Sequence, residues 1–155
     1  MLSEAKFNRF SIALKDLEKA HEFLEEARKH QYGSLIHEAL VFSAIVCFFR
    51  PFTDNEKDPN SKAAKRLEKS DFEPPSNSEI QIYETCKELR NKALAHAEFK
   101  YHPTKLERET GIISSAIFSL VGKAADLKAL QGLIDKFIER CRNRQADYIH
   151  NVRAH

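Results

Sequence analysis

The chain has 155 residues, with 25 Lys and Arg against 23 Asp and Glu, 42% hydrophobic residues and only four glycines. This length predicts one domain that can bury a core, and the balanced composition excludes a disordered chain. The net charge of +2 does not indicate a nucleic-acid-binding protein by overall charge, and the scarcity of glycine favours helices over a β-rich fold.

The first predicted element is an amphipathic helix over residues 5–30. Apolar residues recur there at alternating steps of three and four, which places them along one face. The stripe consists of Phe7, Phe10, Leu14, Leu17 and Leu24, with His21 in the same register. We interpret His21 as a core or interface histidine rather than as a ligand.

A second helix is predicted from Ser34 to Arg50, after the break at Gly33 and before Pro51. Its second half is apolar nearly all round, which is typical of a central, buried helix. Arg50 is then a cation at a helix C-terminus, where it favours the helix dipole. Its alternative role is to direct a guanidinium towards a neighbouring site.

Residues 51–78 are predicted to form a loop inserted between two core helices, with a short helix from Lys62 to Lys69. Ser76 and Glu79 have the spacing of a capping box and predict the start of a third long helix. That helix is expected to reach about Ala97, because Pro103 ends regular helix geometry.

Residues 104–122 fit either a helical or an extended pattern, and we expect a non-helical or short-helix connection there. The last helix is predicted over about 124–152. The prediction for the whole chain is therefore a single all-α domain, residues 1–155, built as an up-and-down bundle of four to five helices.

Three cysteines, Cys47, Cys86 and Cys141, are widely spaced and odd in number, which predicts buried free thiols in a reducing compartment. The N-terminus lacks the apolar run of a signal peptide, and the stretch Ala39–Phe49 is about half the length that spans a bilayer. We therefore expect a cytoplasmic protein without membrane contact. The chain has no phosphate-binding glycine loop, no His-Glu-x-x-His pair and no nucleophile elbow, so no metal and no cofactor is expected.

The stretch ELRNKALAHAEF, which contains Arg90 and His96, is the strongest candidate site. An Arg followed by His six residues later also occurs at Arg144 and His150, so the spacing alone decides nothing. Three features favour the first pair: the amide of Asn91, the small alanines between Arg and His, and a position at a helix end. We interpret Arg144 and His150 as surface or helix-end cations.

LRNKALAHAEF resembles the signature of the HEPN superfamily, and SAIVCFFRPFTDN some forty residues earlier is similar to a subgroup associated with bacterial abortive infection. The resemblance implies a helical bundle that forms a homodimer. It also implies a metal-independent ribonuclease that cuts RNA, with the role of a toxin or antiphage effector and a cognate antitoxin as partner.

Carried onto this sequence, the resemblance assigns the catalytic motif to Arg90, Asn91 and His96. A histidine near neutral pKa can move protons, and a guanidinium can hold two phosphate oxygens. The basic residues around the motif that can supplement phosphate contacts are Arg50, Lys87, Lys92 and Lys100. One departure is Glu98, which stands where some HEPN toxins carry a modified tyrosine, so regulation by that modification is not expected.

Two other readings compete with the nuclease. The first is a non-catalytic HEPN module that binds a nucleotide, RNA or a protein partner without cleavage. The second is a structural helical dimer in which Arg90 and His96 pair across the interface.

Overall fold

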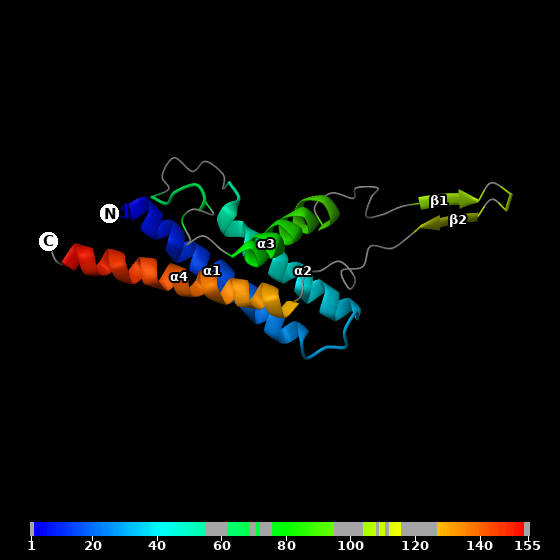
Figure 1. Cartoon of the computed structure of the whole chain (residues 1–155), viewed down its shortest axis with the longest axis horizontal. Helices are drawn as coiled ribbons and strands as arrows, with labels where there is room; N and C mark the ends of the chain where they lie inside the picture. Colours follow the sequence, from blue (N-terminus) through cyan, green and yellow to red (C-terminus); the bar gives the residue numbers. More distant parts are fainter. Residues whose placement is uncertain are drawn as a thin grey trace.

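The structure, a computed structural model, describes residues 2–54, 62–68, 71, 76–94, 104–107, 109–110, 112–115 and 127–153. Its elements are α1 (Glu4–Ala27), α2 (Leu35–Phe49), α3 (Asn77–Glu88), β1 (Thr104–Glu107), β2 (Ile112–Ser115) and α4 (Leu127–Arg153). A 3₁₀ turn, Arg50–Phe52, follows α2, and a π-helical segment, Leu89–Leu94, continues α3. The all-α prediction is confirmed, since four α-helices form the body of the described chain (Figure 1).

Helix α1 packs along both α2 and α4. Its N-terminus is capped by Ser3, whose side chain accepts a hydrogen bond from the backbone N–H of Lys6. Phe10, Leu17 and Leu24 of the predicted stripe are buried. The rest of the buried face consists of three small residues beside them, Ala13, Ala20 and Ala27. Small side chains let neighbouring helix backbones approach closely, which explains why the pattern of large residues alone misplaced the face.

His21 lies at the edge of that face, as an interface histidine. Its ring Nδ1 is 2.7 Å from a carboxylate oxygen of Asp135 on α4. A second pair between the same helices joins Arg142 of α4 to Glu18 of α1 at 2.8 Å. These polar contacts border the packed seam, so they orient the two helices at the surface.

Helix α2 is the central helix that the sequence predicted. Ser34 caps it by accepting from the backbone N–H of His37, and Gly33 makes the preceding turn with a φ of 76°, a conformation that favours glycine. By length and composition alone the segment Leu35–Phe52 is apolar enough to cross a membrane, and 44% of it is buried inside the protein. The core helix of a soluble protein meets the same criterion.

A buried arginine closes the C-terminal end of α2. The guanidinium of Arg9 on α1 donates to the carbonyls of Arg50 and Pro51 at 3.0 and 3.2 Å. The same two carbonyls also accept from the backbone N–H groups of Thr53 and Leu67, so the guanidinium adds a link from α1 to the end of α2. Burial lowers the pKa of Arg9, and the nearby Asp16 opposes that shift.

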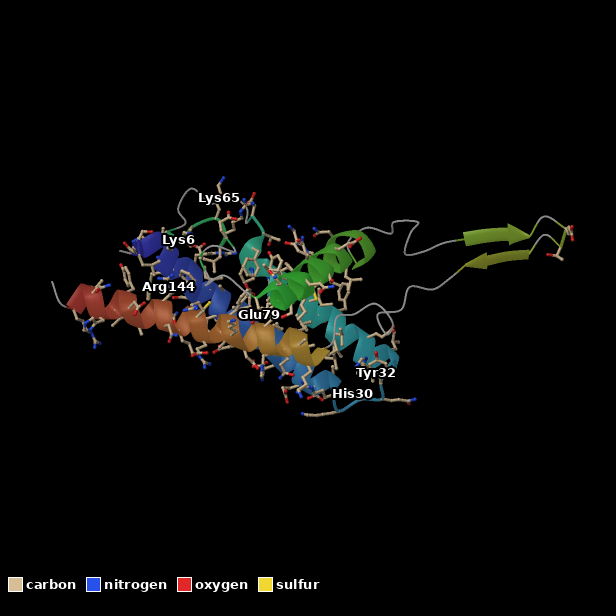
Figure 2. The ribbon with its side chains drawn as sticks, in the orientation of Figure 1. Lys6, His30, Tyr32, Lys65, Glu79 and Arg144 are labelled. Atoms are coloured by element: carbon tan, nitrogen blue, oxygen red, sulfur yellow. The ribbon has the colours of Figure 1, made fainter. Side chains whose placement is uncertain are left out.

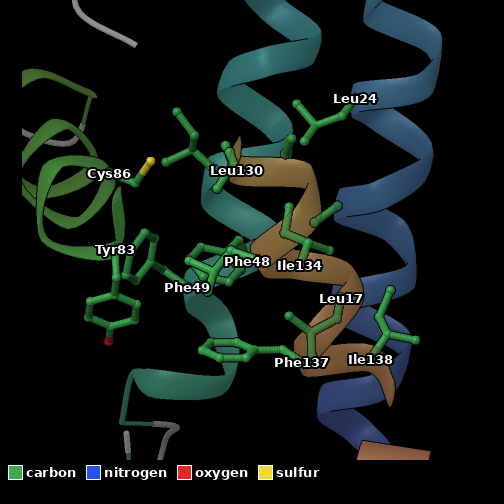
Figure 3. Packing of buried hydrophobic residues seen from close by; sticks show 14 of the residues in the cluster. Leu17, Leu24, Phe48, Phe49, Tyr83, Cys86, Leu130, Ile134, Phe137 and Ile138 are labelled. Atoms are coloured by element: carbon green, nitrogen blue, oxygen red, sulfur yellow. The ribbon is translucent and has the colours of Figure 1, made fainter. Parts of the chain in front are cut away.

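Helix α3 begins as predicted, with a complete capping box between Ser76 and Glu79. Glu79 also accepts from the Lys136 ammonium of α4 at 2.9 Å, which joins the two helices. Burial raises the pKa of Tyr83 to about 12, consistent with its place against aromatic neighbours. The aromatic core that joins α2, the 3₁₀ turn, α3 and α4 comprises Phe48, Phe49, Phe52, Tyr83 and Phe137, of which Figure 3 labels all except Phe52.

The short helix predicted from Lys62 to Lys69 is wrong for the seven residues that the structure describes there, 62–68. Their backbone instead bonds to other parts of the chain: the N–H of Ala64 donates to Ala5 and that of Leu67 to Pro51. Leu67 is fully buried, so the segment lies as a strap that inserts one leucine into the core. Because single residues anchor this segment to distant parts of the chain, its sequence does not have to follow a helical pattern, and the described residues form no helix.

Residues 104–115 resolve the ambiguity of the connection in favour of extended structure. Strands β1 and β2 pair antiparallel, with Thr104 opposite Ser115 and Glu107 opposite Ile112. The hairpin stands clear of the helices (Figure 1). The remainder of that predicted connection, residues 116–122, lies outside the described residues, as does the predicted start of the last helix at 124–126.

The cysteine prediction is confirmed for two of the three thiols. Cys86 and Cys141 are buried and free, and burial raises the pKa of each to about 12. Cys47 is also free but only half-buried. Its pKa is raised by burial, with Arg50 acting in the opposite direction.

Candidate functional site

Arg90 and Asn91 lie in the π-helical segment Leu89–Leu94, directly after the last turn of α3. A π-helix is wider than an α-helix, and such segments occur often at functional sites because they displace side chains from the regular helical positions. The segment packs near α2 and is fixed from beneath by buried residues, Cys86 and Leu89. Arg90 and Asn91 are therefore partly buried rather than on a free helix surface.

The two motif side chains described here contact each other. The Nη1 group of Arg90 donates to the side-chain oxygen of Asn91 at 2.7 Å. Among the described residues no carboxylate forms an ion pair with Arg90, so the amide is the acceptor that holds its guanidinium. A neutral acceptor orients an arginine without neutralising its charge, which leaves the cation available for an anionic group.

His96 and Lys100 lie outside the described residues. The backbone of Lys92 belongs to the π-helical segment. Of the predicted catalytic triad, the structure thus brings Arg90 and Asn91 together.

Arg50 is directed to α1 and is bound there. Its guanidinium is 3.2 Å from a carboxylate oxygen of Asp16, and its backbone carbonyl accepts from Arg9. Burial raises the pKa of Asp16, while Arg50 and Arg9 act to lower it. The observed contacts match the structural role predicted for Arg50 at the end of α2.

Lys87 lies one turn before Arg90, in the last turn of α3, and is about half exposed. Its ammonium is 3.8 Å from a carboxylate oxygen of Glu84, the longest of the ion pairs described for this chain. A weak, solvated pair of this kind costs little to break. Lys87 is therefore available to a phosphate near the motif.

The polar set of Arg9, Asp16 and Arg50 was not predicted as a unit. Arg9 sits directly before Phe10, and Asp16 directly before Leu17, so both carry charge beside residues of the apolar stripe. Because they lie seven residues apart on one helix, Arg9 and Asp16 share a face beside that stripe, which is the signal that could have indicated them. The observed function of this set is to secure the end of α2.

The second Arg and His pair lies in a different setting. Arg144 and His150 are exposed on regular turns of α4, at the rim of a hollow of about 410 Å³ that Asp71 and Asp147 also line. Carboxylates on the same rim repel an anion. The exposure of both residues agrees with the prediction of surface cations, and Figure 2 shows Arg144 on α4.

In the part of the chain that the structure describes, no group of three or more His, Cys, Asp or Glu side chains has the arrangement of a metal site. No protein-family profile, curated protein or solved structure matches this chain. The candidate site therefore rests on its own residues and geometry.

Proposed function

We propose that this protein is a HEPN-type, metal-independent ribonuclease that cleaves RNA at a composite site between two copies of the chain. We also propose that its helices form a HEPN-like, up-and-down bundle. The observation that carries it is the Arg90 guanidinium, held by Asn91 within a π-helical segment at the end of α3. A cation that is oriented but not neutralised is what a phosphate-binding site requires.

The chemistry needs no group beyond protein side chains. His96 of one copy removes the proton from a ribose 2′-hydroxyl, and the 2′-oxygen attacks the adjacent phosphorus. The bond from phosphorus to the 5′-oxygen breaks, and His96 of the second copy protonates that leaving oxygen. The products are a 2′,3′-cyclic phosphate and a 5′-hydroxyl, with every proton accounted for.

Arg90 stabilises the extra negative charge that develops on the phosphate oxygens during attack. Asn91 keeps the guanidinium in place, so the charge is oriented before RNA binds. Lys87, Lys92 and Lys100 add contacts to neighbouring phosphates. Arg50 contributes only peripherally, because a phosphate there has to compete with Asp16.

The proposed location and partners of the protein follow from the same reaction. A ribonuclease without an inhibitor damages its own cell, so the proposal includes a cytoplasmic location and a cognate antitoxin that covers the site. A homodimer supplies the second histidine, and a twofold axis makes the two copies equivalent.

The deciding experiment incubates purified protein with mixed RNA in EDTA. We expect the wild type to release fragments that end in 2′,3′-cyclic phosphate, and we expect His96→Ala to lose this activity while its circular dichroism and thermal melt are unchanged. The matched control is His150→Ala, which removes the other histidine that follows an arginine by six residues.

The control variant should cleave like the wild type. Equal loss in both variants, or cleavage that persists in His96→Ala, would overturn the assignment. Salt-dependent RNA binding without any cleavage by the wild type would favour the non-catalytic binding module instead.

A further inference from the structure

The hollow of about 410 Å³ beside Arg144, here termed the α4 hollow, has no part in the proposed ribonuclease. Its polar wall comes from the C-terminal half of α4 and consists of Arg144, Asp147, His150 and Asn151. Leu2 and Phe10 line it from the N-terminal part of the chain. This half of α4 lies well apart from the π-helical segment (Figure 1). A hollow of this volume is large enough to hold a small molecule.

Arg144 and Asp147 are three residues apart on one helix, yet they form no ion pair with each other or with any other described residue. Elsewhere on the described helices, opposite charges at this spacing close into ion pairs of 2.6 to 3.8 Å: Lys19 with Glu22, Glu25 with Arg28, Glu26 with Lys29 and Glu84 with Lys87. The wall of the α4 hollow therefore presents an unpaired cation and an unpaired anion one helical turn apart.

The remaining charged residue of the α4 hollow, Asp71, is already neutralised. Both of its carboxylate oxygens accept from the ammonium of Lys6 at 2.6 Å, and one of them also accepts from the backbone N–H of Glu68 at 2.7 Å. The charges available to a ligand are thus the guanidinium of Arg144 and the carboxylate of Asp147, which sum to zero.

We propose that the α4 hollow binds a free α-amino acid with an apolar side chain. The ligand's carboxylate accepts from the Arg144 guanidinium, and its ammonium donates to the Asp147 carboxylate. An α-amino acid carries its two charges on one carbon, a short separation that suits two residues one helical turn apart. Its apolar side chain lies against Leu2 and Phe10, where it leaves water.

The unpaired charges favour a zwitterion over an ion of one sign. A simple anion is attracted by Arg144 but repelled by Asp147, and a simple cation meets the reverse. A nucleic acid brings only negative charge to this wall, so the same carboxylate opposes it. An amino acid satisfies both side chains at once.

This inference rests neither on the homodimer nor on the RNA cleavage of the proposed function. The α4 hollow and the Arg90 segment are separate surfaces (Figure 1). Cleavage is measured without any amino acid, so variants of Arg144 and His150 remain valid controls in that assay.

An NMR titration of the isotope-labelled full chain with L-leucine tests the proposal. We expect saturable shifts of the backbone amides between Arg144 and Asn151 and near Leu2, with a Kd of about 0.1 to 10 mM, the range that a ligand of this size allows. Isocaproate lacks the ammonium and isopentylamine lacks the carboxylate. Each should bind at least about fivefold more weakly than L-leucine, because one charge-assisted hydrogen bond is lost.

Two variants assign the charges. Arg144→Gln should raise the Kd for L-leucine at least about fivefold, since the ligand's carboxylate loses its cation. Asp147→Asn should remove the preference for L-leucine, so that L-leucine and isocaproate bind within about twofold of each other.

The matched control is Arg142→Gln. It removes an equal charge two residues from Arg144, from a side chain that is paired with Glu18, and should leave the Kd for L-leucine within about twofold. Arg142, Arg144 and Asp147 are all exposed, so the three variants are expected to fold, and circular dichroism checks this.

The outcomes separate the two proposals. Shifts that do not saturate by about 20 mM L-leucine, isocaproate that binds the wild type as tightly as L-leucine, or equal weakening by Arg142→Gln would each overturn the amino acid site. A short RNA that shifts these amides where L-leucine does not would also overturn it. RNA cleavage in EDTA without L-leucine binding rejects this site and leaves the nuclease standing, whereas L-leucine binding without cleavage supports this site and rejects the nuclease.

Discussion

Two parts of this chain carry the same spacing of arginine and histidine, yet the structure places them in different environments. Arg90 follows a turn with buried Cys86, lies in a π-helical segment and is held by Asn91. Arg144 also follows a buried cysteine, Cys141, but it lies exposed on a regular turn of α4. The comparison shows that backbone geometry and burial, rather than spacing, distinguish a candidate site from a solvated helix face.

The largest expected difference between the two parts is in RNA cleavage by arginine variants. Arg90→Ala should lower kcat/KM by roughly 100- to 1,000-fold, because one oriented donor to a developing charge contributes about that much. Arg144→Ala should change it by less than about twofold, in line with an exposed surface residue. Initial rates on one RNA substrate in EDTA measure both, and similar losses would remove the distinction.

The next difference is in how much one apolar residue next to each pair contributes to the free energy of unfolding. Leu89 is buried directly before Arg90, whereas Ile149 before His150 is exposed at the surface. Leu89→Ala should cost about 2–4 kcal/mol of unfolding free energy, from lost burial and a residual cavity. Ile149→Ala should cost less than about 1 kcal/mol.

Urea denaturation compares the two variants with the wild type. A small effect of Leu89→Ala would mean that the π-helical segment is not anchored by the core. The same samples also show whether any loss of cleavage in Leu89→Ala follows from unfolding or from displacement of Arg90.

A smaller difference is expected for the two asparagines that adjoin the arginines. Asn91→Ala removes the acceptor of the Arg90 guanidinium, and kcat/KM should fall by about tenfold, which corresponds to one charge-assisted hydrogen bond. Asn143→Ala, beside Arg144 on the exposed side of α4, should have no effect on cleavage. If Asn91 only orients Arg90, guanidinium added at millimolar concentration should not rescue Asn91→Ala but should partly rescue Arg90→Ala.

The sequence predicted the elements that follow a regular period or a local cap. The capping box at Ser76 and the central helix α2 are confirmed because each is decided by a few neighbouring residues. The short helix predicted from Lys62 to Lys69 was wrong for residues 62–68, because distant segments fix Leu67 and the backbone of Ala64 and leave no local pattern.

For the candidate site, the sequence predicted which residues to consider but not their geometry. Arg90 and Asn91 were identified from residue type, whereas the change from α- to π-helix at Leu89 has no periodic signal in LRNKAL. The contact between the two side chains depends on that change in backbone. Arg50 illustrates the converse, since its role at the end of α2 was predicted but its partner Asp16, thirty-four residues away, was not.

The smallest expected difference concerns phosphate contacts beside each pair. Lys87→Ala should weaken RNA binding about two- to threefold at low salt and reduce the slope of log affinity against log salt by about one, because one fewer counterion is released. Arg142→Ala removes an equal charge beside Arg144, where Arg142 is paired with Glu18 at 2.8 Å, and should leave the slope unchanged. Fluorescence anisotropy with a short RNA from about 50 to 200 mM salt measures both slopes. A reduced slope for Arg142→Ala with none for Lys87→Ala would place the RNA on α4, and the comparison would then favour the hollow beside Arg144 over the π-helical segment.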